Sequence, residues 1–185
     1  ATSGSTLGGT GTVLSATINN GATVDPGTAL TPISTLTVDG NGAPAFTQLA
    51  GSTYEVDIND GGTTAGINND LIGLTAAAST ASLDGTVSVF DTTGGLGNNY
   101  AAGSTYTILQ TANPNGVTGM YTGVTDNLFL RDAQLFHNPD SVEMQLFRVS
   151  GDFEAKGMTR NQMNVGEVLD EETPFATGDF GDGLD

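Results

Sequence analysis

The chain has 185 residues, of which 27 are glycine and only 6% are aromatic, a composition that predicts one domain with a thin core rather than a wide one. Its formal charge of −17 argues against nucleic acid or an anionic membrane surface as a partner. Cysteine is absent, which excludes disulfides, thiolate catalysis and thiolate metal sites together. No run approaches the roughly 20 apolar residues of a membrane-spanning helix, so we expect no membrane insertion by this chain.

The first half of the chain alternates short β-type runs with tight turns. Residues 12–19 predict a strand that ends at the strong turn signal Asn20-Gly21. The clearest alternation is at residues 54–59, where Tyr54 and every second residue after it point to one face while acidic and amide side chains point to the other. Residues 82–91 predict a further strand with Leu83, Val87 and Val89 on one side.

This repeated pattern predicts an all-β fold. A β-sandwich would need a wider core, whereas a parallel β-helix needs only contacts between neighbouring turns and suits a chain rich in Thr, Val and Asn. We therefore expect a β-helix, with roughly six or seven turns if each takes about 20–25 residues.

The pattern changes after residue 103, where bulky apolar residues concentrate. Two strands, residues 128–136 and 141–149, are joined by a turn at His137-Asn138-Pro139-Asp140 and predict an antiparallel hairpin. A solenoid must cover its open end, so this hairpin is the candidate C-terminal cap. From residue 156 to residue 169 the period becomes helical, and residues 171–185 form a short acidic tail.

Candidate chemical sites are weak. Asp57, Asp60 and Asp70 could bind Ca²⁺ through their oxygens, but no Lys or Arg precedes Arg131, so no cation accompanies a polysaccharide-cleaving site there. His137 has no paired nucleophile and indicates a surface histidine. We therefore assign no catalytic, cofactor or metal residue and expect no cofactor and no enzyme activity, with a polysaccharide-acting or calcium-binding domain as the alternative.

Three short motifs resemble the C-terminal passenger region of bacterial autotransporters, which use type V secretion. The passenger stem of that family ends in G-x-x-Y-x-I-L and then V-x-G-x-F, and it is followed by a helix with T-x-N-Q-x-x-V-A-x-x-L. The matching positions are Gly103, Tyr106, Ile108 and Leu109; then Val117, Gly119 and Tyr121; then Thr159, Asn161, Gln162, Val165 and Leu169. Tyr121 stands where Phe is usual, and Gly166 replaces the usual Ala.

The resemblance implies a right-handed parallel β-helix stem (residues 1–102), an autochaperone cap (103–150), a linker helix toward a membrane β-barrel outside this chain (151–170) and a flexible tail (171–185). It implies that the chain supports an adhesin at the bacterial cell surface and templates folding during secretion. Its partners would be its own barrel and, through upstream passenger, host surfaces or other copies; a protease stem is a further alternative. The autochaperone core would comprise Tyr106, Ile108, Leu109, Val117, Gly119, Tyr121, Val142, Met144 and Leu146.

Overall fold

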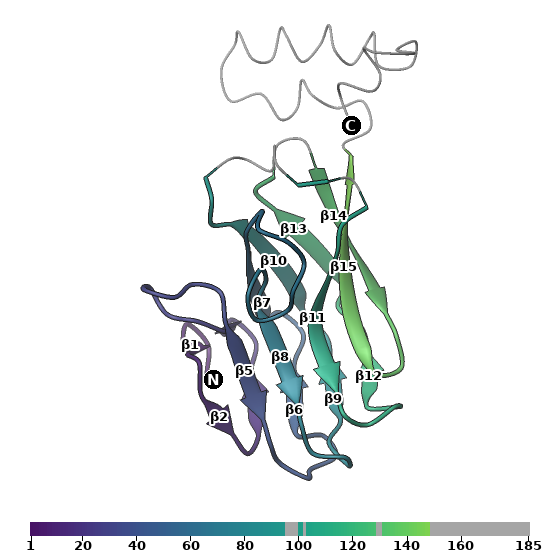
Figure 1. Cartoon of the computed structure of the whole chain (residues 1–185). Helices are drawn as coiled ribbons and strands as arrows, with labels where there is room; N and C mark the ends of the chain where they lie inside the picture. The colour runs from purple at the N-terminus through teal and green to yellow at the C-terminus, as the bar shows by residue number, and fades with distance from the viewer. Residues whose placement is uncertain (95–99, 102, 129–130, 149–185) are drawn as a thin grey trace, which may run out of the picture.

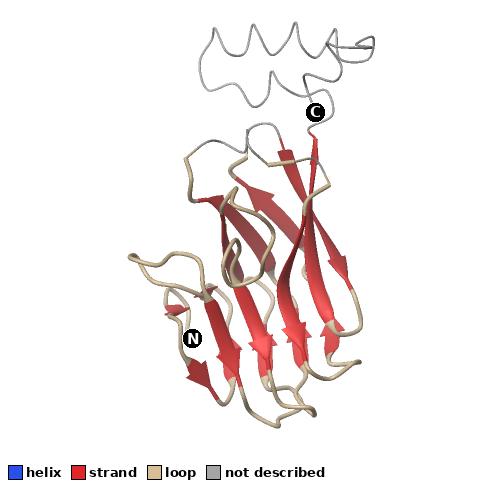
Figure 2. Ribbon diagram, viewed as in Figure 1, coloured by secondary structure: helices blue, strands red, loops and turns tan. Residues whose placement is uncertain are grey.

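The computed structural model describes residues 1–94, 100–101, 103–128 and 131–148. Every regular element in those ranges is a β-strand, as Figure 2 shows. The predicted linker helix, with Thr159, Asn161, Gln162, Val165 and Leu169, lies outside the described residues, as does the acidic tail. Among the described residues, no helix is long and apolar enough to cross a bilayer.

The strands form three sheets, and the chain visits them in turn. Sheet A contains β1 (Thr6–Gly8), β4 (Thr23–Asp25), β7 (Thr53–Ile58), β10 (Thr86–Asp91) and β13 (Gly123–Asp126). Sheet B contains β2 (Thr12–Val13), β5 (Thr35–Val38), β8 (Leu71–Leu74), β11 (Thr105–Thr111), β15 (Ser141–Arg148) and β14 (Arg131–His137). Sheet C contains β3 (Ala16–Ile18), β6 (Phe46–Gln48), β9 (Ala81–Leu83) and β12 (Val117–Gly119).

Each strand up to β13 pairs in parallel with strands three places away in chain order, because every turn passes once through sheets A, B and C. The result is a parallel β-solenoid of about three turns, which confirms the predicted β-helix. Figure 1 shows the turns stacked side by side from the N-terminus to β14 and β15. Its strand-to-strand contacts are those of a solenoid, in which each turn touches only its neighbours.

The predicted number of turns was wrong, because after a short first advance of the chain the turns are longer than expected and grow along the chain. In sheet A, Thr6 pairs with Thr23, Thr23 with Thr53, Thr53 with Thr86 and Thr86 with Gly123. From one sheet A strand to the next, the paired position therefore advances by 17, 30, 33 and 37 residues. The strands themselves stay short, at two to eight residues each, so the added length lies in the loops at the corners.

The core is a set of apolar ladders inside the three sheets. In sheet A, Val24 lies in register between Leu7 and Tyr54, and Val87 continues the row to Val124. Val24, Tyr54 and Val87 are fully buried. Stacking of this kind buries apolar surface along one axis rather than around one centre, which explains why so few aromatic residues suffice.

The end of the solenoid is closed by the antiparallel hairpin β14–β15, as predicted. Strand β11 pairs in parallel with β8 on one side and antiparallel with β15 on the other, so the sheet changes its pairing direction at this strand. The register between β11 and β15 shifts between Thr107 and Leu109. A β-bulge of this kind leaves one residue out of the ladder and bends the strand. Here it places two successive side chains, Ile108 and Leu109, in the core.

Two predicted strands proved to be pairs of strands that turn a corner. Residues 82–91 include the end of β9 and all of β10, which belong to different sheets, with Gly85 at a φ of 75° between them. Residues 12–19 likewise include β2 and β3. Ala16, Ile18, Leu83, Val87 and Val89 are still buried, because the inside of a solenoid is continuous around its corners, whereas Leu14 and Phe90 are exposed. The domain boundary placed at residues 102 and 103 stays a prediction.

Candidate functional site

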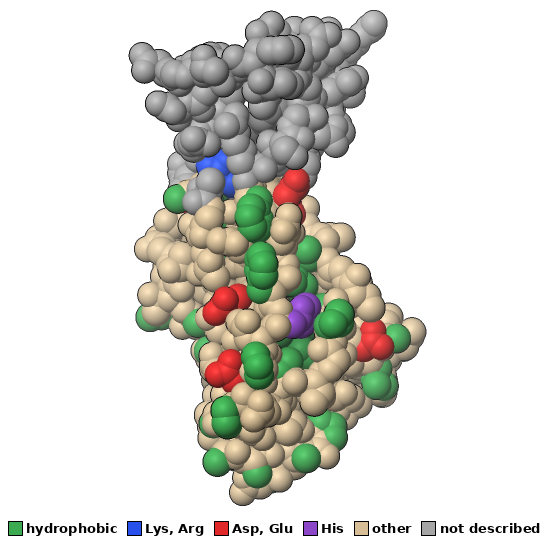
Figure 3. All heavy atoms as spheres, turned by 90° about the vertical axis from the view of Figure 1, so that its right-hand side faces the viewer, with side chains coloured by type: hydrophobic (Ala, Val, Ile, Leu, Met, Phe, Trp, Pro, Cys, Tyr) green, Lys and Arg blue, Asp and Glu red, His purple; other side chains and the backbone are tan. Residues whose placement is uncertain are grey.

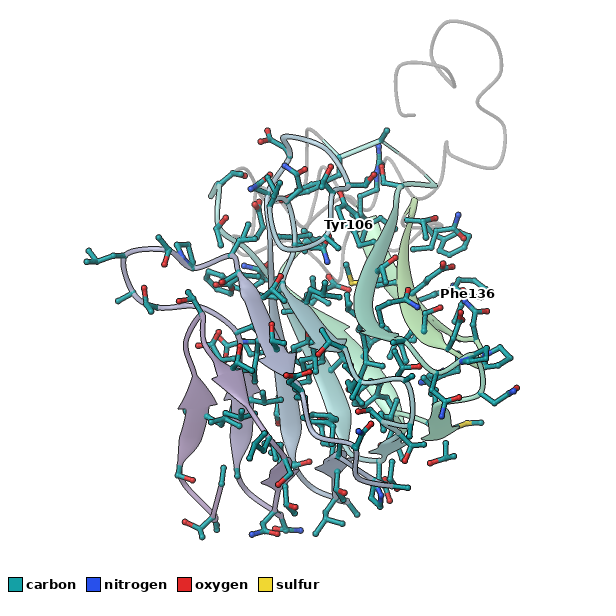
Figure 4. All side chains as sticks on the ribbon, turned by 60° about the horizontal axis from the view of Figure 1, so that its bottom comes forward. Tyr106 and Phe136 are labelled. Carbon is teal, nitrogen blue, oxygen red and sulfur yellow. The ribbon has the colours of Figure 1, made fainter. Side chains whose placement is uncertain are left out.

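The predicted autochaperone core occupies the last turn and the hairpin cap. The residues that the structure buries there are Tyr106, Ile108, Leu109, Tyr121, Val142, Met144 and Leu146. Val117 is partly buried and packs against this core, whereas Gly119 lies at the exposed end of β12. In Figure 4, Tyr106 points into the body of the molecule, while Phe136 lies on the outer side of the hairpin.

Gly119 has a structural reason to be glycine. Its φ is 71°, which is the left-handed region that side chains with a Cβ rarely adopt. A Cβ atom there would also lie 2.3 Å from the carbonyl oxygen of Leu83 in the turn below. Gly119 therefore allows the chain to leave β12 in close contact with β9.

Tyr54 links the middle turn to the bulge in β11. The bulge takes Ile108 out of the ladder with β15, and the Tyr54 hydroxyl donates a hydrogen bond of 2.8 Å to the Ile108 carbonyl oxygen. Burial raises the pKa of the Tyr54 phenol well above its ordinary value, with the charge of Asp70 as a smaller cause, so the hydroxyl keeps its proton. Because β11 also pairs with β8 at this point, the bond adds a side-chain contact from the middle turn to a carbonyl inside the sheet.

A second aromatic contact joins the core to the hairpin. The Tyr121 ring lies 6.3 Å from the Tyr54 ring and 5.9 Å from the imidazole of His137 at the end of β14. The backbone N–H of Tyr121 donates a 3.1 Å hydrogen bond to His137 Nε2. Burial lowers the pKa of His137, which favours the neutral imidazole that can accept this bond. The Nε2 atom of His137 is therefore engaged in joining β14 to Tyr121.

A groove with a volume of about 380 Å³ runs between β13 and β14. Its lining includes Val124 from β13, Leu135 from β14, and Met120, whose side chain is largely exposed. Asp126 Oδ2 accepts a 3.1 Å hydrogen bond from the Ala133 backbone N–H, which joins the two strands across the groove. Figure 3 shows this side of the molecule, with His137 in purple among apolar side chains in green and acidic side chains in red nearby.

Three carboxylates meet at the corner between sheets A and B. The carboxylate oxygens of Asp25, Asp57 and Asp70 all lie within 4.8 Å of one another. Asp70 is fully buried, and its two oxygens accept hydrogen bonds from the backbone N–H groups of Ser34, at 2.8 Å, and Asp57, at 2.9 Å. The parallel stacking causes this meeting, because Asp25 ends β4 and Asp57 lies in the neighbouring strand β7, two residues beyond the position that matches Asp25.

Burial dominates the electrostatics of this corner. It raises the pKa of Asp70 to about 8, even though the two backbone hydrogen bonds act in the opposite direction. It raises the pKa of Asp57 to about 6, and the charge of Asp25 adds to this. Two chemical arrangements are compatible with such a group: protons shared among the carboxylates, or a hard cation such as Ca²⁺ held by their oxygens.

Two of these three residues could be predicted from the sequence, and the third could not. Asp57 and Asp70 lie together as the calcium hypothesis required, but Asp25 completes the group in place of Asp60. Asp25 is 32 residues before Asp57 in a Pro-Gly turn, so no local spacing signals their contact. Knowledge of the turn length would have been needed to align them.

Neither a known family model nor a curated protein matches the chain.

Proposed function

We propose that this chain is a structural stem whose last turn and hairpin act as an autochaperone, in an autotransporter passenger at the bacterial cell surface. One observation supports the proposal most: a parallel solenoid ends in an antiparallel hairpin that covers its last sheet B strand, β11. A solenoid can fold by adding turns to a template, but its first folded unit has none. That unit must therefore be stable on local contacts alone.

The hairpin region has the features that such a starting unit needs. Strands β14 and β15 are joined by a short turn, so their contacts are close in sequence and cost little loop-closure entropy. On its inner face, Val142, Met144 and Leu146 are fully buried. By contrast, the parallel pairs of the earlier turns join residues up to 37 positions apart. The hairpin should consequently form before the turns that precede it.

The rest of the surface fits a support rather than a site of chemistry. The acidic corner and the groove beside β14 are both small, and His137 is engaged in the contact with Tyr121. The strong negative charge keeps such a surface soluble and separate from other copies. We propose that binding to host surfaces belongs to upstream passenger rather than to this stem.

Refolding kinetics test the order of folding. Leu146→Ala removes a fully buried side chain from the cap, and Ile18→Ala removes one from the first turn as a matched control. Each should lower the free energy of unfolding by about 2–5 kcal/mol. If the cap forms first, Leu146→Ala slows refolding, while Ile18→Ala leaves the refolding rate nearly unchanged and speeds unfolding.

Stopped-flow refolding from urea measures both rates, and protease accessibility on intact cells expressing the whole gene measures surface display. The proposal requires that Leu146→Ala reduce display more than Ile18→Ala does. If Ile18→Ala slows refolding and Leu146→Ala does not, the first unit to fold lies at the N-terminal end, and the proposal is contradicted.

A further inference from the structure

The sequence contains three Asn-Gly pairs, and the structure places them in very different surroundings. They are Asn20-Gly21, Asn41-Gly42 and Asn115-Gly116. In such a pair the glycine nitrogen can attack the asparagine side-chain carbonyl carbon, forming a C–N bond that closes a five-membered succinimide. The side-chain nitrogen leaves as ammonia with the glycine amide proton. Water then opens the ring to aspartate or isoaspartate. Glycine permits this because it has no Cβ to hinder the approach.

The first pair is held at both reacting groups. The Gly21 N–H donates a 2.9 Å hydrogen bond to the Gly51 carbonyl oxygen of the next turn. The Asn20 side-chain nitrogen donates to the Ala50 carbonyl oxygen at 3.2 Å. Attack would require the Gly21 nitrogen to leave its hydrogen bond to Gly51 and the Asn20 side chain to leave its hydrogen bond to Ala50.

The third pair is held within its own turn. The Gly116 N–H donates to the Asn113 carbonyl oxygen at 3.0 Å, and the Asn115 N–H donates to Asn113 Oδ1 at 3.1 Å. These bonds fix the backbone on both sides of the peptide group that would have to rotate. Breaking a bond of this kind before attack slows the reaction by about tenfold, since its net worth is about 1 kcal/mol or slightly more.

The second pair lies on the exposed corner between β5 and β6, and we propose that Asn41 is the deamidation site of this protein. Asn41 and Gly42 are both exposed. The Gly42 carbonyl oxygen accepts a hydrogen bond of 3.3 Å from the Thr80 N–H. Within the described residues, the Gly42 N–H itself donates no hydrogen bond. The nucleophile is therefore free while the peptide group stays in place.

The modification is compatible with the fold. Isoaspartate adds one carbon to the main chain, and here that carbon enters a corner loop rather than a strand that must stay in register with its neighbours. The product also adds a negative charge to a chain whose formal charge is already −17. Modified molecules thus accumulate in the folded state and record the age of the protein. This holds independently of the proposed role in secretion.

The test is peptide mapping by mass spectrometry of the folded protein during incubation at pH 8 and 37 °C, with enzymatic methylation to detect isoaspartate. Asn41 should convert about tenfold faster than Asn20 or Asn115. The same protein in urea supplies the control, because unfolding removes the hydrogen bonds and should bring the three rates together. Equal rates in the folded protein, or a faster rate at Asn20 or Asn115, would overturn the proposal.

Gly42→Ala supplies a matched variant. A Cβ at this position would come no closer than 3.4 Å to the Pro44 carbonyl oxygen, and φ is not in the left-handed region, so the fold should tolerate it. Conversion of Asn41 should become much slower while Asn20 and Asn115 are unaffected. An unchanged rate at Asn41 would show that the loss of the amide proceeds by another route and would refute the assignment.

Discussion

Two buried tyrosines whose rings contact each other should respond in opposite ways to the loss of one oxygen atom. Tyr54→Phe removes the hydroxyl that donates to the Ile108 carbonyl oxygen at the bulge in β11. Tyr121→Phe removes a hydroxyl that has no hydrogen-bond partner among the described residues, although it too is buried. Both changes keep the ring and its packing, so the comparison isolates the hydrogen bond.

The expected magnitudes follow from this difference. Tyr54→Phe removes one hydrogen bond to a buried carbonyl oxygen in the β11–β8 ladder, which should lower the free energy of unfolding by about 0.5–1.5 kcal/mol. Tyr121→Phe removes a polar group that gains nothing from being buried, so it should leave the stability unchanged or raise it by up to about 1 kcal/mol. Because the two rings touch, the double variant also reports any coupling between them.

Urea denaturation followed by circular dichroism measures both free energies, and the dependence on urea concentration checks that the unfolding transition is the same. Equal destabilisation by the two variants would refute the reasoning, because it would mean that the Tyr121 hydroxyl has a partner of similar value. A neutral Tyr54→Phe would show that this hydrogen bond contributes nothing measurable to stability.

Two further predictions concern the core and the acidic corner. Gln48 is buried in sheet C, next to Ile18 in the ladder, and neither polar atom of its side chain has a hydrogen bond within the described residues. Gln48→Met should therefore raise the free energy of unfolding by about 1–3 kcal/mol. A loss of stability in urea denaturation would contradict this prediction. Between pH 3.8 and about 8 the folded Asp70 carboxyl holds a proton that the unfolded chain releases, so its contribution to stability should be greatest at the acidic end and fall as the pH rises through about 8. Asp25→Asn removes one negative charge beside Asp57 and Asp70, so it should make Tm depend less steeply on pH, measured in EDTA. An unaltered slope of Tm against pH would show that the charge of Asp25 does not affect the other two carboxylates. A rise in Tm on adding calcium at pH 8 that Asp25→Asn abolishes would instead identify the corner as a metal site.

Much of the architecture could be predicted from local patterns. The alternation of Tyr54, Val56 and Ile58 placed those side chains inside, and all three are fully buried. The Asn-Pro-Asp turn after His137 identified the hairpin, whose strands pair from Arg131 and Arg148 to His137 and Val142. These predictions succeeded because a strand exposes alternate residues to opposite faces and a hairpin is closed by its own turn, both of which are properties of a few adjacent residues.

The corners and the length of each turn were decided only by the tertiary structure. The run from residue 82 to residue 91 alternates as one strand would, yet the chain bends at Gly85 because the next position in register lies in another sheet. Turn lengths of 17 to 37 residues leave no fixed period in the sequence. A loop at a corner can lengthen at little energetic cost, because only the strands must match the turn below.

The sequence by itself determined the inward apolar face of strands such as β7 and where the hairpin lies, since both depend on neighbours along the chain. Only the tertiary structure decided that Asp25 joins Asp57 and Asp70 and that Tyr54 donates to the carbonyl of Ile108. It also decided that, of the three Asn-Gly pairs, Asn41-Gly42 is the one whose glycine N–H donates no hydrogen bond within the described residues. These features depend on which residues of different turns or loops lie close enough to make a hydrogen bond. Their distance in space is set by the stacking of the strands, which no spacing along the chain records.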